Sequence, residues 1–164
     1  MEVTHEGKLY PNPFTPKYLS VINTLLGKSK YSEQMRKILI IEDSKPFRRL
    51  VEFILTKANY EVISAKDGFE AIYRLSEGEV PDLIITDIEM PNFTGEELIT
   101  NLFNSGLFSY IPVIILTGIE SETVKEKCIA SGAYAYLNKP FDPTELLKYV
   151  EDAIEASKAK LENK

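Results

Sequence analysis

The sequence predicts an α/β fold in which a doubly wound, five-stranded parallel sheet is covered by helices on both faces. The first observation is that, from residue 37 onward, short apolar runs alternate with segments whose apolar residues recur at the helical period. Strands and helices that alternate in this way favour a parallel sheet. The second observation is that several of the runs are continuously apolar, which is typical of strands buried on both faces.

The expected strands are short, and each is preceded or followed by polar residues. They span residues 38–41, 60–64, 83–85, 111–116 and 134–137. The first, third and fourth of them contain the runs that are apolar without interruption. These three strands are therefore expected in the middle of the sheet, where both faces are covered.

A helix is expected after each strand, and three of the helices have a recognisable start. Asp67 and Thr94 can accept hydrogen bonds from the first backbone N–H groups of a helix. Glu96 and Glu97 then lie in the first turn, where acidic residues are stabilising. The segment 142–145 combines an N-cap carboxylate, a proline at the first helical position and a glutamate two positions later. The expected helices span residues 44–58, 67–77, 94–105 and 122–130, with a last helix that begins at 142 and continues past 154.

The composition excludes several classes of function. Hydrophobic residues make up 44% of the 164 residues, which is enough for one buried core. A net charge of −6 disfavours nucleic acid and anionic membranes as direct partners. The single cysteine, Cys128, excludes an intrachain disulfide and a cysteine metal cage, and the single histidine, His5, excludes a histidine-rich metal site.

Neither a membrane-spanning helix nor a signal peptide is expected. The longest runs of aliphatic residues have four residues, whereas a spanning helix needs about 18. The first residues do not combine a basic stretch with an apolar run. The expected location is therefore the cytoplasm.

The chain is expected to divide near residue 37. Residues 1–36 hold three of the nine prolines and carry five basic and three acidic residues, so the remaining residues carry 14 basic and 22 acidic ones. This shift predicts an N-terminal arm at 1–36, an acidic domain at 37–157 and a C-terminal tail at 158–164. No further domain is expected after the last helix.

Polar residues follow four of the expected strands. Glu42 and Asp43 come after the first strand, Asp87 after the third, Thr117 after the fourth and Lys139 after the fifth. In open parallel sheets, ligands bind at the carboxyl ends of the strands. Carboxylates gathered there repel one another unless a cation lies between them, and oxygen ligands with room for water suit Mg²⁺. A carboxylate nucleophile, a metal, a hydroxyl and a lysine are what phosphoryl transfer to an aspartate would use.

In these residues and their surroundings the chain resembles the receiver domain of two-component response regulators. Four signatures carry the resemblance: the acidic pair in ILIIED, the segment IITDIEMP around Asp87, the step Thr117-Gly118 and the stretch GAYAYLNKPF. All four occur in the order and spacing typical of the family, and the resemblance covers about residues 37–155. It implies a flavodoxin-like sheet with the strand order 2-1-3-4-5.

The resemblance also implies a metal site. Asp87 and Asp43 correspond to direct carboxylate ligands of Mg²⁺, and Glu42 corresponds to a residue that acts mainly through metal-bound water. The backbone carbonyl of Glu89 would supply a further ligand. Two side chains depart from the commonest pattern: Glu42 replaces a more frequent aspartate, and Glu89 adds a carboxylate two residues after Asp87.

The remaining implied roles concern the phosphoryl group. Asp87 corresponds to the phosphoacceptor, and Thr117 and Lys139 to residues that hold phosphoryl oxygens. Tyr136 corresponds to the aromatic switch residue, whose ring follows the Thr117 hydroxyl. In this family the bond equivalent to Lys139-Pro140 is often cis, although cis bonds before proline are otherwise uncommon.

The implied function is that of a single-domain response regulator. A sensor histidine kinase or a phosphotransfer protein would supply the phosphoryl group, and a downstream protein would read the altered surface, with homodimerisation as a further possibility. The chain would not be an enzyme, and neither direct nucleic-acid binding nor membrane insertion is expected.

Three alternatives remain for this function. The chain could be a phosphorelay intermediate, or a degenerate receiver that serves only as a binding module, although the residues whose loss marks such receivers are all present. A haloacid-dehalogenase-like phosphatase also uses an aspartyl phosphate. That class places its nucleophile after the first strand, where this chain has Glu42 and Asp43, and it usually carries a cap insertion for which the chain has no room.

The arm is expected to contain a short amphipathic helix at about residues 16–26. Thr15 and Pro16 can begin it and Gly27 can end it. One arc of this helix carries only apolar side chains: Tyr18, Leu19, Val21, Ile22, Leu25 and Leu26. A helix this short needs a surface for that arc. It could pack permanently on its own domain or on a dimer mate, or it could dock on the last two helices and the last strand and respond to modification of Asp87.

Overall fold

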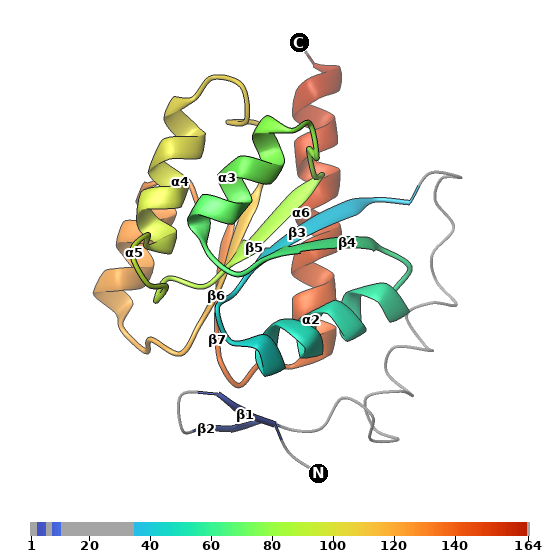
Figure 1. Ribbon diagram of the computed structural model, residues 1–164. Coiled ribbons are helices and arrows are strands. Elements are labelled where there is room, and N and C mark those ends of the chain that lie inside the picture. The colour runs from blue at the N-terminus through green and yellow to red at the C-terminus, as the bar shows by residue number, and fades with distance from the viewer. Residues whose placement is uncertain (1–2, 6–7, 11–34, 164) are drawn as a thin grey trace.

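The protein is a parallel sheet between two layers of helices (Figure 1). The computed structural model describes residues 3–5, 8–10 and 35–163. Its sheet has the order β4-β3-β5-β6-β7, and every neighbouring pair is parallel. The strands are β3 (Lys37–Ile41), β4 (Glu61–Ala65), β5 (Leu83–Thr86), β6 (Val113–Thr117) and β7 (Ala135–Asn138). This confirms the predicted five-stranded sheet and its order 2-1-3-4-5.

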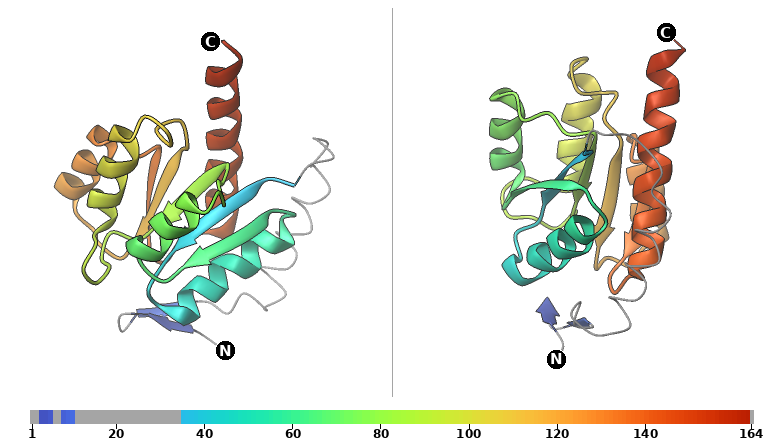
Figure 2. Two further views of the ribbon diagram at one scale, coloured as in Figure 1. Left: turned by 45° about the horizontal axis from the view of Figure 1, so that its top comes forward. Right: turned by 90° about the vertical axis from the view of Figure 1, so that its right-hand side faces the viewer.

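The helices lie on both faces of the sheet, as predicted. α2 (Lys45–Lys57) and α6 (Pro143–Glu162) pack on one face and share a core with alternate strand residues. On the other face, α3 (Gly68–Ser76) and α4 (Gly95–Asn104) contribute most of the helical residues of a second core, to which α5 (Glu122–Ala130) adds Cys128. The right-hand view of Figure 2 shows α3 and α4 on one side of the strands and α6 on the other.

Each central strand has an uninterrupted apolar run, because successive residues of that run face one or the other of these two cores. In β3, Ile38 and Ile40 belong to the core beneath α2 and α6, whereas Leu39 and Ile41 belong to the core beneath the other three helices. All four are at most 1% exposed. Burying one such side chain contributes about 2 kcal/mol, so β3 is anchored from both faces.

The predicted helix starts are confirmed. Asp67 accepts a hydrogen bond from the backbone N–H of Glu70, and Asp142 accepts one from Thr144. Thr94 forms a reciprocal capping box with Glu97, in which each side chain accepts from the other residue's backbone N–H. These caps fix where the helices begin just beyond the carboxyl ends of the strands.

The last helix continues past residue 154, as expected, and ends at Glu162. Most of the residues expected as a C-terminal tail, 158–164, are therefore helical. Lysine, alanine and leucine in its last turns favour helix. The Ser157 hydroxyl also donates a 2.9 Å hydrogen bond to the Tyr110 carbonyl, which ties this part of the helix to the loop before β6.

The described part of the N-terminal arm contains two strands that the sequence analysis did not predict. β1 (Val3–His5) and β2 (Lys8–Tyr10) pair antiparallel, and β1 lies against α2. The amphipathic helix predicted at 16–26 lies outside the described residues. Among the residues that are described, no helix has the length and apolar character needed to cross a membrane.

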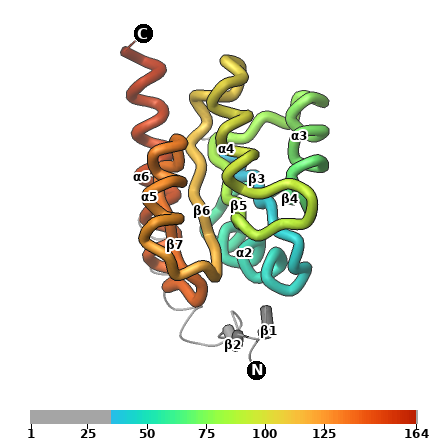
Figure 3. Tube along the Cα trace, turned by 90° about the vertical axis from the view of Figure 1, so that its left-hand side faces the viewer, coloured from blue at the N-terminus to red at the C-terminus, as the bar shows by residue number. Residues whose placement is uncertain are grey.

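The strand register brings the carboxyl ends of the strands to one edge of the sheet. Ile41 pairs with Thr86, and Thr117 pairs with Asn138. The final helix runs back toward the opposite edge, so the C-terminus lies at the far end of the molecule (Figure 3). Residues that follow β3, β5, β6 and β7 therefore meet at the carboxyl edge.

Candidate functional site at the carboxyl edge

Four of the predicted site residues meet at this edge. Glu42 and Asp43 follow β3, Asp87 follows β5, and Lys139 follows β7. The backbone continues the sheet pairing at two of them: the Asp87 N–H donates to the Ile41 carbonyl, and the Lys139 N–H donates to the Thr117 carbonyl. The chain segments that carry these side chains are thus held by the sheet itself.

A buried lysine lies between two buried carboxylates. The Lys139 ammonium is 2.8 Å from Oε2 of Glu42 and 2.9 Å from Oδ2 of Asp87. All three residues are at most 2% exposed. Charges this deeply buried are tolerated only when they are paired and hydrogen-bonded. Lys139 therefore neutralises part of the negative charge that the two acids bring into the interior.

The protonation of Glu42 is shifted by this environment. Burial raises the pKa of its carboxyl group from the ordinary 4.5 to about 7, the Lys139 ammonium opposes the shift, and the Asp87 carboxylate adds to it. One of its oxygens also accepts a hydrogen bond from the Ser44 N–H. Near neutral pH, a cation that binds here would favour the ionised form of Glu42.

The three acids form a group that could hold a metal ion. One carboxylate oxygen from each of Glu42, Asp43 and Asp87 lies within 4.8 Å of the others. Asp43 is exposed, whereas the other two acids are buried. The other Asp87 oxygen, Oδ1, accepts from the backbone N–H groups of Ile88 and Glu89 at 2.6 and 3.2 Å. Such an all-oxygen group with one solvent-facing side fits a hard divalent cation such as Mg²⁺, which keeps some of its water.

Thr117 and Tyr136 converge on a neighbouring loop. The Thr117 hydroxyl oxygen accepts from the Ile119 N–H at 3.4 Å, and the Tyr136 hydroxyl donates to the Ile119 carbonyl at 2.8 Å. Burial raises the pKa of Tyr136 to about 12, with smaller effects from Cys128, Asp87 and other nearby acids. The phenol therefore stays protonated and keeps its donor. Thr117 and Tyr136, both predicted from the sequence as site residues, are therefore connected through their hydrogen bonds to Ile119 in the loop after β6.

Two residues of the site were not identified as functional from the sequence. The Phe47 ring lies beneath the lysine, with its centroid 3.9 Å from Nζ of Lys139. The Arg48 guanidinium donates a 2.6 Å hydrogen bond to the backbone carbonyl of Glu42. At the helical period, Phe47 falls on the apolar face of the expected helix 44–58, and its position five residues after Glu42 is the one signal of a role at this site.

Gly95 permits the close approach of α4 to the Asp87 backbone. A Cβ atom at this position would lie 3.0 Å from both the Asp87 carbonyl carbon and the Ile88 Cα, and closer still to the carbonyl oxygen. Gly95→Ala is therefore expected to lower the free energy of unfolding by about 2 kcal/mol, because crowded backbone must shift. Urea denaturation measures this loss. Thr100→Ala, at an exposed position of the same helix, is the control; a loss no larger than the control's would contradict the crowding.

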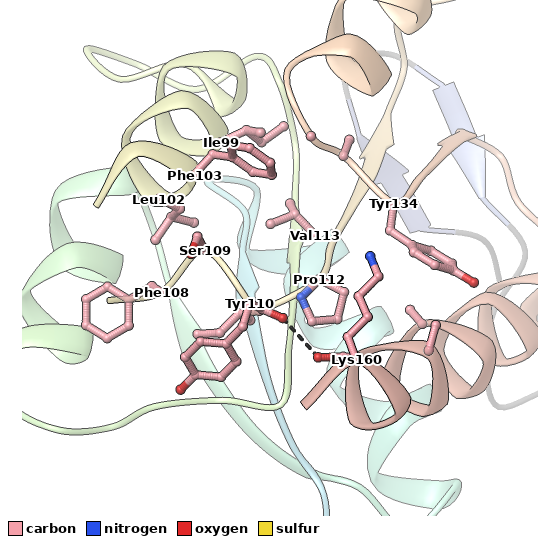
Figure 4. A pocket seen from close by; sticks show the side chains of 16 residues that line it. Ile99, Leu102, Phe103, Phe108, Ser109, Tyr110, Pro112, Val113, Tyr134 and Lys160 are labelled. Atoms are coloured by element: carbon pink, nitrogen blue, oxygen red, sulfur yellow. Dashed lines mark hydrogen bonds between the residues drawn. The ribbon is translucent and has the colours of Figure 1, made fainter. Parts of the chain in front are cut away.

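A pocket at the opposite edge of the sheet is separate from this site. It has a volume of about 370 Å³ and lies before β6 and β7, between α4 and the end of α6 (Figure 4). Pro112, Tyr134 and Lys160 are among its lining residues. Because this pocket lies at the amino ends of the strands, it is not part of the acidic site at their carboxyl ends.

Comparison with known proteins agrees with this geometry. Residues 38–151 match the family model of the response regulator receiver domain. The chain is 37% identical to Protein PilG of Pseudomonas aeruginosa over 111 residues, which cover 68% of this chain and 82% of that protein. It is 34% identical to the phosphate regulon transcriptional regulatory protein PhoB of Escherichia coli over 116 residues, or 71% and 50% of the two chains.

Solved structures give the same result. The chemotaxis protein CheY4 of Vibrio cholerae superposes with a TM-score of 0.68 at 35% identity, covering 73% of this chain and 99% of that one. Among the sequence relatives, a hybrid signal transduction histidine kinase of Dictyostelium discoideum is 35% identical over 75% of this chain, and the matched region spans only 8% of the kinase. The similarity thus concerns one domain-sized region, which occurs in proteins of different lengths. The chain belongs to the family of response regulator receiver domains of two-component signalling.

Proposed function

We propose that the chain is a response regulator that accepts a phosphoryl group on Asp87 and signals through protein contact. The observation that carries this proposal is the meeting of Asp87, the acids Glu42 and Asp43, and the buried Lys139 at one edge of the sheet. The near-complete coverage of CheY4 supports a regulator of this kind. A sensor histidine kinase or a phosphotransfer protein would supply the phosphoryl group.

The proposed reaction is the transfer of a phosphoryl group to a carboxylate. One Asp87 oxygen forms a bond to phosphorus, the bond from phosphorus to the donor breaks, and the donor leaves with the electron pair. With acetyl phosphate as donor, acetate leaves and no proton is gained or lost. Lys139, already 2.9 Å from Oδ2 of Asp87, would hold a phosphoryl oxygen, and Thr117 would donate to another.

The acidic cluster supports a resident Mg²⁺. Asp43 and Asp87 would hold it directly, Glu42 would hold one of its waters, and the backbone carbonyl of Glu89 would complete the protein ligands. When bound, Mg²⁺ offsets the charge that builds up on the phosphoryl oxygens. The cluster satisfies the need for oxygen ligands within one small region.

Thr117 and Tyr136 are proposed to carry the effect of Asp87 phosphorylation to the protein surface. If the Thr117 hydroxyl turns toward a phosphoryl oxygen, it gives up its contact with the Ile119 N–H. The Tyr136 hydroxyl is bonded to the carbonyl of the same residue, so the loop after β6 and the tyrosine ring would change together. A downstream protein would read that surface, which includes α5 and β7.

The decisive experiment is stoichiometric labelling with acetyl phosphate in the presence and absence of Mg²⁺. We expect up to one phosphoryl group per chain with Mg²⁺ and none after chelation, measured by intact-protein mass spectrometry. No labelling under either condition would indicate a binding module. Continuous hydrolysis of many phosphorylated substrates would instead favour the phosphatase.

Mg²⁺ affinity is expected to depend more on Asp43 than on Glu42. Asp43→Ala removes a direct ligand and should weaken binding by roughly tenfold or more, whereas Glu42→Ala removes a contact through water and should weaken it less. Calorimetric titration of each variant measures the order. Glu96→Ala, an exposed acid on α4, is the control. Equal or reversed losses would refute the assignment of the direct ligand.

A further inference from the structure

We propose that Phe47 is a positioning residue for phosphoryl transfer, because the face of its ring holds the Lys139 ammonium beside Asp87 through a cation–π interaction. This inference rests on the proposed function, since it concerns the lysine that would hold the phosphoryl group. It adds an aromatic ring to the groups that contact the buried lysine.

The geometry of the contact is favourable. Nζ of Lys139 lies 3.9 Å from the Phe47 centroid, well inside the limit of about 6 Å for an energetically significant cation–π pair. Lys139 is 0% exposed and Phe47 is 1% exposed. Because neither group faces water, the attraction between the cation and the ring is not screened, which is the setting in which such pairs are strongest.

The ring itself is held in place. Phe47 lies in the first turn of α2, where its backbone N–H donates to the Ser44 hydroxyl oxygen. Phe141 packs against it in an edge-to-face arrangement, with centroids 5.9 Å apart and planes at 82°. Phe47 is also part of the core beneath α2 and α6. The surface that it offers to Lys139 is therefore rigid.

An aromatic ring suits this position better than other side chains would. A third carboxylate close to the ammonium would attract it strongly, but it would also repel an incoming phosphoryl group and compete for the N–H donors of the lysine. An aliphatic side chain would fill the space without attracting the charge. The ring attracts the cation while adding no net charge, so Lys139 stays near Asp87 and keeps its N–H groups directed at oxygen.

Replacing Phe47 with mono-, di- and trifluorinated phenylalanine tests the proposal in the full chain. Each fluorine weakens the negative face of the ring with little change in size. The rate of phosphorylation by acetyl phosphate, at saturating Mg²⁺ and fixed pH, is expected to fall stepwise to roughly one tenth with the trifluorinated ring. Mg²⁺ affinity, measured in parallel, should not change.

Phe141 provides the matched control, because it packs against Phe47 rather than against the lysine. The same fluorinated series at Phe141 should leave the rate unchanged. Equal rates throughout the Phe47 series, or an equal decline in the Phe141 series, would overturn the positioning role and leave Phe47 as packing. If the unsubstituted chain is not labelled at all, the proposed function fails instead, so the two failures are distinguishable.

Discussion

Asp87→Asn is expected to abolish phosphorylation while leaving the fold intact. The amide is nearly isosteric with the carboxylate but is not a nucleophile under these conditions. Its oxygen can still accept from the Ile88 and Glu89 N–H groups that now bond to Oδ1. Mass spectrometry after incubation with acetyl phosphate and Mg²⁺ measures the adduct, and urea denaturation confirms that the variant is folded.

The control for this experiment is a second aspartate-to-asparagine change far from the carboxyl edge. Asp152 is exposed on α6, and Asp152→Asn should be labelled to the same extent as the unmodified chain. A phosphoryl adduct of undiminished yield on Asp87→Asn would remove Asp87 from the reaction.

Lys139→Met is expected to lower the free energy of unfolding by about 3 kcal/mol at pH 8. The substitution retains most of the buried volume but leaves Glu42 and Asp87 without the ammonium that lies 2.8 and 2.9 Å from their oxygens. Two buried carboxylates then repel each other without compensation. Urea denaturation without divalent cations measures the loss.

The loss should depend on pH in a defined direction. The pKa of Glu42 in the folded protein is about 7, above its ordinary 4.5, so the folded state holds this proton more tightly than the unfolded state. Stability from this group is present below pH 4.5 and is lost as the pH rises through 7. Without Lys139 the pKa of Glu42 should rise further. Lys139→Met should therefore be less destabilising at pH 5 than at pH 8.

A second substitution separates this charge effect from packing. Glu42→Gln removes one of the two repelling charges, so it should recover part of the stability that Lys139→Met loses. Lys148→Met, at an exposed position of α6, is the control for the substitution itself. Full stability of Lys139→Met at pH 8 would contradict the account of the buried ion pairs.

The parts of the fold that local chemistry determines could be predicted from the sequence. Asp67, Thr94 and Asp142 cap their helices because a short polar side chain before an amphipathic run satisfies the first N–H groups. Likewise, Asp87 and Lys139 meet although they are 52 residues apart, because parallel strands place their carboxyl ends at one edge. The parallel topology therefore brings together residues that are far apart in the sequence.

Other features depend on tertiary contacts that periodicity does not encode. The helical period puts Phe47 on an apolar face, but only packing brings its ring beneath Lys139. The strands β1 and β2 have three residues each, too few for an alternating pattern to be recognised. The sequence does not locate the end of α6, because its last turns are rich in lysine and glutamate, which indicate exposure but do not end a helix.

The most direct test of the central claim is to map the modified residue after labelling. Borohydride reduction of the acyl phosphate, followed by peptide mass spectrometry, converts the labelled aspartate into homoserine and so identifies its position. We expect homoserine at position 87 only, and only when Mg²⁺ and acetyl phosphate are both present. Reduction at Asp43, or unchanged aspartate at position 87 in a chain that carries the phosphoryl group, would contradict this expectation.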